Sequence, residues 1–92
     1  MVKHNGQWGT VCDDGISPGG VYDAKSVLAA HSACHTLGLS GGSITTTTGP
    51  EGPIWMDDVD CATSTTNFLT CSHRGWGVEN CAHGEDVLLT CT

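Results

Sequence analysis

The sequence has little positive charge. Lys3, Lys25 and Arg74 are its only lysine and arginine residues, against ten aspartate and glutamate residues, and the formal net charge at pH 7 is −7. Nucleic acids and anionic lipid surfaces both select basic protein surfaces. The composition therefore argues against binding nucleic acid through a basic patch and against attachment to an anionic membrane.

Bulky apolar residues are also scarce. The 92 residues include one phenylalanine, one tyrosine and three tryptophans, but 13 glycines. No apolar run approaches the roughly 20 residues that span a bilayer, so direct insertion into a membrane is not expected. A chain of this length forms one domain, whose core by itself stabilises it only marginally. We expect Trp8 and Trp55 to belong to that core.

Six cysteines offset the small core. An even number of cysteines in a short, glycine-rich chain predicts three disulfides and an extracellular location. Each bridge that closes a loop of tens of residues contributes roughly 3–4.5 kcal/mol in the chain-entropy model. Six cysteines allow fifteen pairings. Because Met1 leads into a strand-like segment without an export signal, we expect residues 1–92 to be a single domain from a larger secreted or membrane-anchored protein.

The N-terminal residues predict a β-hairpin. Asn5-Gly6 separates two strand-like segments, 2–4 and 7–11. Asn-Gly is the strongest signal for a type I′ turn, because both central positions of that turn require a positive φ.

A helix is predicted after the glycine- and proline-rich loop at residues 15–22. Asp23 is a candidate N-cap, the helix extends to about Leu37, and Gly38 ends it. Helical spacing predicts an inward face formed by Ala24, Val27, Leu28, His31, Cys34 and Leu37.

The second half of the chain contains short patterns that predict strands, loops and a turn. We interpret residues 40–52 as a solvated connector, with a short strand as the alternative, and residues 62–66 as a loop. A strand is predicted around Trp55, and a short turn at 67–71 buries Phe68 or Leu69. Residues 87–91 read as a buried final strand.

Acidic residues recur beside cysteines. Asp13-Asp14 follows Cys12, Asp57-Asp58 precedes Cys61, and Glu85-Asp86 follows Cys81. Adjacent carboxylates repel one another and do not favour strand formation, so a cation held against them would explain their positions.

Four motifs, in this order along the chain, resemble the scavenger receptor cysteine-rich (SRCR) family. They are QWGTVCDDG at 7–15, GPIWMDDVDC at 52–61, CSHRGWG at 71–77 and NCAHGED at 80–86. The six-cysteine count, with Leu39 where eight-cysteine members carry a cysteine, is similar to group A of the family. The family's N-terminal strand is mostly absent, and Ile16 stands where a tryptophan is expected. The chain therefore resembles a divergent member.

This resemblance implies an α+β fold. The expected domain is small and disulfide-stapled, with a curved antiparallel sheet of about six strands cradling one helix at about 23–37. The implied bridges are Cys12–Cys81, Cys34–Cys91 and Cys61–Cys71.

The resemblance also implies two Ca²⁺ sites. The first site would use Asp13, Asp14 and Glu85, and the second would use Asp57, Asp58 and Asn80. Ca²⁺ takes six to eight oxygen ligands, which carboxylates and amides supply. Without a metal, the same carboxylates would cap turns or accept backbone N–H bonds.

Two functions follow as hypotheses. In the first, the domain is an extracellular recognition module that binds anionic ligands (microbial or host polyanions, or acidic groups on proteins) by cation bridging through Ca²⁺, assisted by Arg74. In the second, it is a structural or protein-interaction module that needs no metal and presents a tryptophan face, Trp76 or Trp55.

Catalysis is not expected. Cysteines in disulfides are not nucleophiles, and the sequence contains none of the common hydrolase, phosphate-loop or metalloprotease motifs. His73 and His83 lie near cysteines, but without the paired spacing of structural zinc sites.

Overall fold

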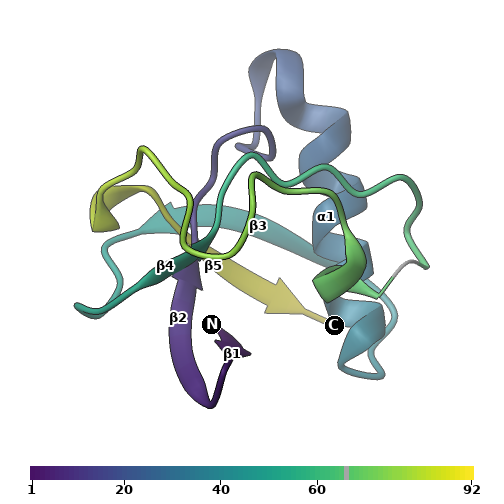
Figure 1. Ribbon diagram of the computed structural model, residues 1–92. Helices are drawn as coiled ribbons and strands as arrows, with labels where there is room; N and C mark the ends of the chain where they lie inside the picture. Colours follow the sequence, from purple (N-terminus) through teal and green to yellow (C-terminus); the bar gives the residue numbers. More distant parts are fainter. Residues whose placement is uncertain (66) are drawn as a thin grey trace.

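Five short strands and one α-helix form the fold described by the computed structural model, which covers residues 1–65 and 67–92 (Figure 1). The strands form a three-stranded sheet in the order β1-β2-β4 and a two-stranded sheet of β3 and β5. Their bounds are β1 Val2–His4, β2 Gln7–Val11, β3 Gly42–Thr47, β4 Ile54–Met56 and β5 Asp86–Cys91, and helix α1 spans Asp23–Thr36. Three 3₁₀ turns complete the structure: η1 Gly20–Tyr22, η2 Phe68–Thr70 and η3 His83–Glu85.

The predicted α+β class is confirmed, with two corrections to the sheet. The described residues form five strands rather than about six, and these lie in two separate sheets. In addition, β2 and β4 pair in parallel, through Thr10 with Ile54 and Val11 with Met56, so the strands are not all antiparallel. The long connection from β2 through α1 and β3 allows this parallel pairing.

The hairpin forms as predicted. β1 and β2 pair antiparallel, with His4 opposite Gln7. Asn5 and Gly6 have φ values of 51° and 78°, the positive values that a type I′ turn requires.

Helix α1 ends at the predicted glycine. Gly38 adopts a φ of 81°, its N–H donates to the carbonyl of His35, and the N–H of Leu39 donates to the carbonyl of Cys34. These two bonds define a Schellman motif. At the other end, Asp23 is the first helical residue rather than the N-cap, and its carboxylate accepts a hydrogen bond from Gly19 N at 2.9 Å.

The predicted inward face of α1 is only partly correct, because Cys34 is buried and Leu28 packs against the core as predicted, but other positions on that face are exposed. Val27 is 50% exposed and Leu37 is 67% exposed, and the buried positions are Ser26, Ala29, Ala30, Ser32 and Cys34. Small side chains let the helix approach β3 closely. A Cβ on Gly42 of β3 would overlap Cys34 Sγ. The close contact therefore selects small residues over large ones.

The interpretation of residues 40–52 as a solvated connector is wrong, because this segment contains β3. It pairs with β5 over six positions, from Gly42 with Cys91 to Thr47 with Asp86. The prediction of a buried last strand also needs correction, because Leu88 in the middle of β5 is 50% exposed.

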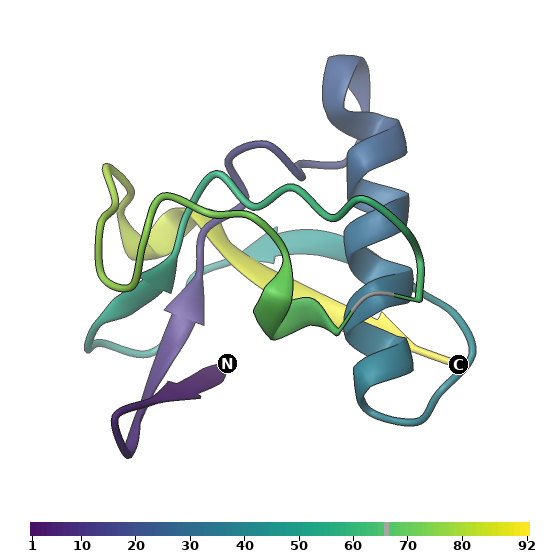
Figure 2. The same ribbon diagram turned by 45° about the vertical axis from the view of Figure 1, so that its right-hand side comes forward.

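The hydrophobic core lies where α1, the two sheets and the central loops meet (Figure 2). Its members include Val11, Ile44 and Met56 from three strands, and Ile16 from the loop before α1. Ile16 has no exposed surface, so it fills the position where a tryptophan was expected.

The turn at 67–71 buries Phe68 and leaves Leu69 42% exposed, one of the two predicted outcomes. The loop predicted at 62–66 is free of helix and strand over 62–65, and Thr66 lies outside the described residues. Trp8 is 58% exposed and does not belong to the core, while Trp55 is partly buried against it.

All three implied disulfides are present. Cys12–Cys81, Cys34–Cys91 and Cys61–Cys71 have Cα–Cα distances of 6.4, 5.6 and 4.7 Å. The second bridge joins α1 to the end of β5. In the described part of the chain, no helix has the length and apolar character needed to cross a membrane.

Candidate metal centre

One disulfide brings the predicted acidic loops together. Cys12 follows β2, and Cys81, 69 residues later, precedes η3. A backbone hydrogen bond from Asp13 N to Glu85 O, at 2.9 Å, holds the two loops side by side. The bridge and this bond fix the backbone positions from which the acidic side chains project.

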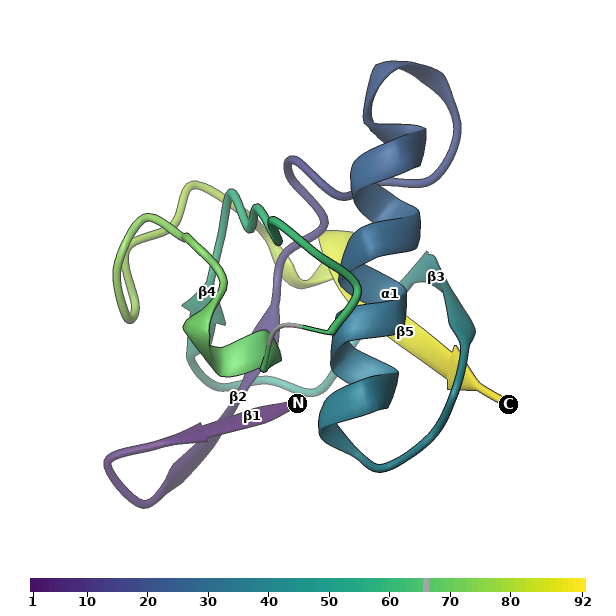
Figure 3. The same ribbon diagram turned by 90° about the vertical axis from the view of Figure 1, so that its right-hand side faces the viewer.

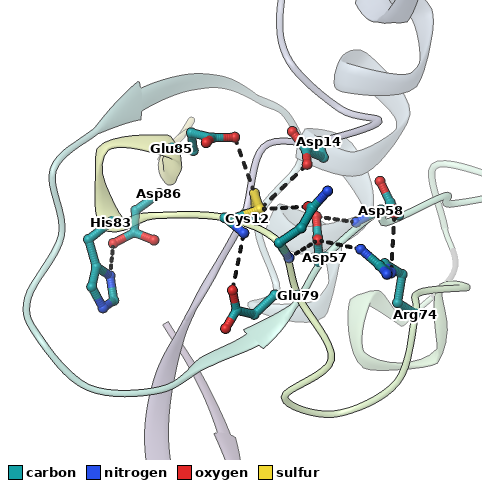
Figure 4. The surroundings of a disulfide bond; sticks show 11 residues. Cys12, Asp14, Asp57, Asp58, Arg74, Glu79, His83, Glu85 and Asp86 are labelled. Atoms are coloured by element: carbon teal, nitrogen blue, oxygen red, sulfur yellow. Dashed lines mark hydrogen bonds and ion pairs between the residues drawn. A yellow bond between two sulfur atoms is a disulfide. The ribbon is translucent and has the colours of Figure 1, made fainter.

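The three residues of the first predicted site lie together. Asp13, Asp14 and Glu85 each place a carboxylate oxygen within 4.8 Å of those of the other two. Figure 4 shows Asp14 and Glu85 directed toward Cys12 from different loops. Glu85 Oε2 lies 3.8 Å from Cys12 Sγ, and Asp14 Oδ2 lies 3.5 Å from Cys81 Sγ. The sulfurs are bonded to each other, so the oxygens are the available ligand atoms.

The carboxylates perturb one another. Burial raises the pKa of Asp13, and the charge of Asp14 raises it further. Burial also raises the pKa of Asp14, with added repulsion from Asp57 and Glu85. Desolvation and like charge both disfavour the ionised form. A bound cation would favour the ionised form and so oppose the rise in both pKa values.

Asp57, from the second predicted site, extends the same group. Its side chain has no exposed surface, and one of its oxygens lies within 4.8 Å of an Asp14 oxygen. Asp57 Oδ1 accepts from the Asp58 N–H at 2.8 Å, and Oδ2 accepts from the Asn80 N–H at 3.1 Å. We call Asp13, Asp14, Asp57 and Glu85 the acidic cluster.

Asn80 bridges the two predicted sites. With its amide oriented so that its hydrogen bonds are satisfied, Nδ2 donates to Asp14 Oδ2 at 3.1 Å and to Asp57 Oδ2 at 2.9 Å. In the opposite orientation, its oxygen faces the same two carboxylate oxygens. That orientation suits a cation held among the three oxygens.

Asp58 departs from the predicted arrangement. It adopts a φ of 52°, a conformation that aspartate tolerates better than most residues, so the chain turns sharply between the two aspartates. Its carboxylate lies 3.6 Å from Arg74 Nε, and Arg74 Nη1 lies 3.6 Å from Asp57 Oδ2 (Figure 4). The structure thus joins the two predicted sites through Asp14 and directs Asp58 toward Arg74.

The donor set fits a divalent cation that prefers oxygen. Asp13, Asp14 and Glu85 form no ion pair with a lysine, arginine or histidine among the described residues. Arg74 neutralises only the Asp57 side of the cluster. Three carboxylates and an amide oxygen are the ligands that Ca²⁺ takes. The candidate metal groups within the described ranges contain no histidine, and their cysteines are in disulfides, so they lack the thiolate and imidazole ligands that structural zinc sites use.

The predicted tryptophan face is packed rather than open. The Trp76 ring stacks on His4 with a centroid distance of 4.2 Å, and His73 meets it edge-on at 4.9 Å. Trp55 contacts His4 and donates from Nε1 to Gln7 O at 2.9 Å. The most exposed tryptophan is Trp8, with Lys3 Nζ 5.8 Å from its ring centroid.

The sequence analysis missed a histidine–aspartate pair beside the cluster. His83 Nδ1 lies 2.7 Å from Asp86 Oδ2, and Nε2 lies 2.9 Å from Gly52 O. Both ring nitrogens thus face acceptors, and these hydrogen bonds raise the pKa of His83. The i,i+3 spacing of His83 and Asp86 was the only sequence signal for this pair.

These features define a class of protein: a small, disulfide-stapled α+β domain that presents an acidic surface site. The chain belongs to the SRCR family, since the family model described as "Scavenger receptor cysteine-rich domain" matches residues 1–92. SRCR domains are extracellular modules that mediate ligand or protein interactions, and the domain itself is a non-catalytic recognition module.

Known relatives agree with this assignment. The SRCR domain of mouse MARCO, solved in a dimeric form, is 35% identical with a TM-score of 0.82, covering 99% of this chain and 81% of that one. The third SRCR domain of murine neurotrypsin is 32% identical with a TM-score of 0.73, covering 96% and 78%. Lysyl oxidase homolog 2 of Bos taurus is 40% identical over 99% of this chain, which spans only 11% of that protein.

Proposed function

We propose that this domain holds Ca²⁺ at the acidic cluster and uses the bound ion to recognise anionic ligands. The observation that supports this most directly is the grouping of carboxylate oxygens of Asp13, Asp14 and Glu85 within 4.8 Å, with no ion pair to a lysine, arginine or histidine that the structure describes. Such a group is unfavourable by itself, as the raised pKa values of Asp13 and Asp14 indicate. A divalent cation would convert this repulsion into attraction.

The mechanism would be cation bridging. The protein supplies carboxylate oxygens on one side of the ion, and the remaining coordination positions face solvent, where a sulfate, phosphate or carboxylate group can bind. Arg74, which is 39% exposed, lies at the edge of the cluster and can contact the same anionic group. Three fixed positive charges in the whole chain are too few to attract polyanions without the ion.

The domain would act as part of a larger protein. It is 40% identical to a segment that forms 11% of a curated relative. We propose that the parent protein is secreted or carries this domain in the ectodomain of a membrane protein.

A calcium titration tests the metal site. We expect saturable heat on adding Ca²⁺ to the oxidised domain in a calorimeter, and loss of that heat in Glu85→Gln. Glu51→Gln removes the same charge from an exposed position outside the cluster, so it should bind as the wild type does. The absence of heat and of a thermal shift at millimolar Ca²⁺ would refute the metal site.

Dextran sulfate then tests the bridging step. It should bind the Ca²⁺-loaded domain, dissociate on adding EDTA, and fail to bind Glu85→Gln. Binding that persists in EDTA would exclude cation bridging, even if Ca²⁺ itself binds.

The metal-independent alternative has less support, because it depends on an exposed face at Trp76 or Trp55. Trp76 and Trp55 are both partly buried and both contact the His4 ring, which reduces the aromatic surface that they offer to a partner. Loss of dextran sulfate binding in Trp76→Ala, with chelator-insensitive binding in the wild type, would favour this alternative.

A further inference from the structure

Arg74 contacts both aspartates of the pair that precedes Cys61. Its Nη1 lies 3.6 Å from Asp57 Oδ2, and its Nε lies 3.6 Å from Asp58 Oδ2 (Figure 4). A charge-assisted hydrogen bond between such groups is about 2.7–2.9 Å long. The guanidinium therefore lies loosely between the two carboxylates, close enough for attraction but without a short hydrogen bond to either.

The backbone fixes the point from which Arg74 reaches the acidic cluster. Its loop, between η2 and η3, runs beside β4 (Figure 3). The N–H of Arg74 donates to the carbonyl of Asp57 at 3.1 Å, and the N–H of Gly77 donates to the carbonyl of Trp55 at 2.9 Å. The Arg74 side chain is 39% exposed. Its guanidinium can therefore move toward solvent while its backbone stays in place.

Asp57, in contrast, is held through both of its carboxylate oxygens. Oδ1 accepts from the Asp58 N–H at 2.8 Å, Oδ2 accepts from the Asn80 N–H at 3.1 Å, and the side chain has no exposed surface. Oδ2 is the oxygen that Arg74 contacts, and it also lies beside the Asn80 amide together with Asp14 Oδ2. A cation held between Asp14 and Asp57 would therefore use the same oxygen as Arg74.

One buried oxygen cannot attract two neighbouring cations without repulsion between them. Because Asp57 is fixed and Arg74 is partly exposed, Arg74 is the group that can move away. We propose that Arg74 competes with the metal for Asp57 Oδ2, and that its guanidinium leaves this oxygen when the metal binds. The guanidinium, still tethered beside the cluster, then pairs with the anionic group of the ligand.

This competition rests on the proposed function, and it gives Arg74 opposite effects on the two binding steps. Arg74 opposes metal binding and favours anion binding. Removing it should therefore strengthen the first step and weaken the second. A merely structural role would weaken both steps, because a disturbed cluster would hold neither the metal nor the ligand well.

Calcium titrations of two variants test the competition. Arg74→Gln removes the guanidinium from the cluster. Lys25→Gln removes the same charge from a side chain of similar exposure, 43%, which pairs with Asp60. We expect Arg74→Gln to bind Ca²⁺ roughly fivefold more tightly than Lys25→Gln. Melting temperatures in EDTA would verify that both variants are folded.

The Arg74 side chain can be followed directly by NMR. Arg74 is the only arginine in the sequence, so its Nε–H gives a single signal of its kind. We expect this signal to shift to saturation as Ca²⁺ is added, and its hydrogen exchange to become faster, because the guanidinium loses a carboxylate partner. In Glu85→Gln, the signal should stay unchanged over the same range of Ca²⁺ concentration.

Dextran sulfate measures the second step. At saturating Ca²⁺, Arg74→Gln should bind this polymer at least about threefold more weakly than Lys25→Gln. Equal binding by the two variants would refute the contact between Arg74 and the anion.

The outcomes separate the competition from the calcium site itself. If the wild type binds Ca²⁺ but Arg74→Gln binds it no more tightly than Lys25→Gln, the competition is refuted and the calcium site stands. If calcium heat appears only in Arg74→Gln, the site in the wild type is refuted and the competition is supported. If neither protein binds Ca²⁺, both are refuted. An Arg74 Nε–H signal that stays unchanged while the wild type saturates would also refute the release.

Discussion

Arg74 Nη1 lies 3.6 Å from Asp57 Oδ2, and this contact joins a side chain that is 39% exposed to one with no exposed surface. The backbone supports the contact, because the N–H of Arg74 donates to the carbonyl of Asp57 at 3.1 Å. The pair therefore links the buried base of the acidic cluster to the protein surface.

Removing this partner should destabilise the fold. Arg74→Gln leaves the buried Asp57 charge without its cation, and we expect the free energy of unfolding to fall by about 1–2 kcal/mol, less than for a fully buried pair because Arg74 is partly solvated. Urea denaturation measures the change. Arg74→Lys, which keeps the charge, should lose less. Unchanged stability in Arg74→Gln would show that the backbone bonds alone hold Asp57.

Asp14→Asn should have opposite effects on stability and on metal binding. Burial and repulsion raise the pKa of Asp14, so its ionised form opposes folding without a cation. We expect Asp14→Asn to raise the melting temperature in EDTA and to weaken Ca²⁺ binding about tenfold. Thermal scans with and without Ca²⁺ check both effects. A lower melting temperature in EDTA would contradict the assignment of repulsion to the cluster.

The effect of Asp14 on folding stability changes with pH in a definite direction. Its pKa in the folded state lies above the ordinary value of an aspartate, so the folded state takes up a proton first as the pH falls. Protonation of Asp14 therefore adds to the free energy of unfolding as the pH falls through the folded pKa. This pH dependence should be missing in Asp14→Asn. Urea titrations at several pH values between 4 and 7 measure it.

His83 should stabilise the domain in mildly acid solution. The hydrogen bond to Asp86, and then the one to Gly52, raise its pKa above the ordinary histidine value of about 6.5. Its contribution is fully present below the unfolded pKa and is lost as the pH rises through the folded value. We expect the unfolding free energy of the wild type to fall over this window and that of His83→Gln to change less. An NMR titration of the His83 ring that gives a pKa below 6.5 would contradict this prediction.

The disulfides should contribute unequally. Cys34 and Cys91 are 57 residues apart, and Cys61 and Cys71 are 10 apart. In the chain-entropy model, the longer loop is worth about 4 kcal/mol and the shorter about 3 kcal/mol. Double alanine variants at each bridge, compared by denaturation, should show the larger loss for Cys34 and Cys91. The reverse order would indicate that buried contacts, rather than loop entropy, dominate.

Thr10→Val should stabilise the free domain. The Thr10 hydroxyl is buried and has no hydrogen-bond partner among residues 1–65 and 67–92, and valine has nearly the same shape. We expect the free energy of unfolding to rise by about 1 kcal/mol. Thr45→Val, at an exposed position in β3, is the control and should change stability little. A loss of stability in Thr10→Val would show that the hydroxyl is satisfied in solution.

Elements with a local physical cause were predictable from the sequence. The Asn5-Gly6 turn and the Gly38 helix end each depend on a positive φ that asparagine or glycine adopts at low cost. The three bridges and the acidic residues of the first site were expected from the SRCR motifs, and the structure confirms the bridges and brings those residues together.

Elements that depend on distant partners were missed. β3 contains one buried apolar residue, Ile44, among exposed serine and threonine, so it lacks a strong alternating pattern and is recognised only through its pairing with β5. The face of α1 was partly misassigned because its buried positions are mostly small residues such as Ala29 and Ala30, which a search for large apolar residues passes over in favour of Val27.

The sequence by itself determined that this chain is a small, acidic, disulfide-stapled domain with carboxylates beside its cysteines, because charge, cysteine count and turn residues act locally or through composition. The tertiary structure decided that Asp14 joins the two predicted sites, that Asp58 turns toward Arg74, and that residues of β1 and β5 line one groove. These relationships depend on how segments far apart in the chain pack together, and no single segment encodes that packing.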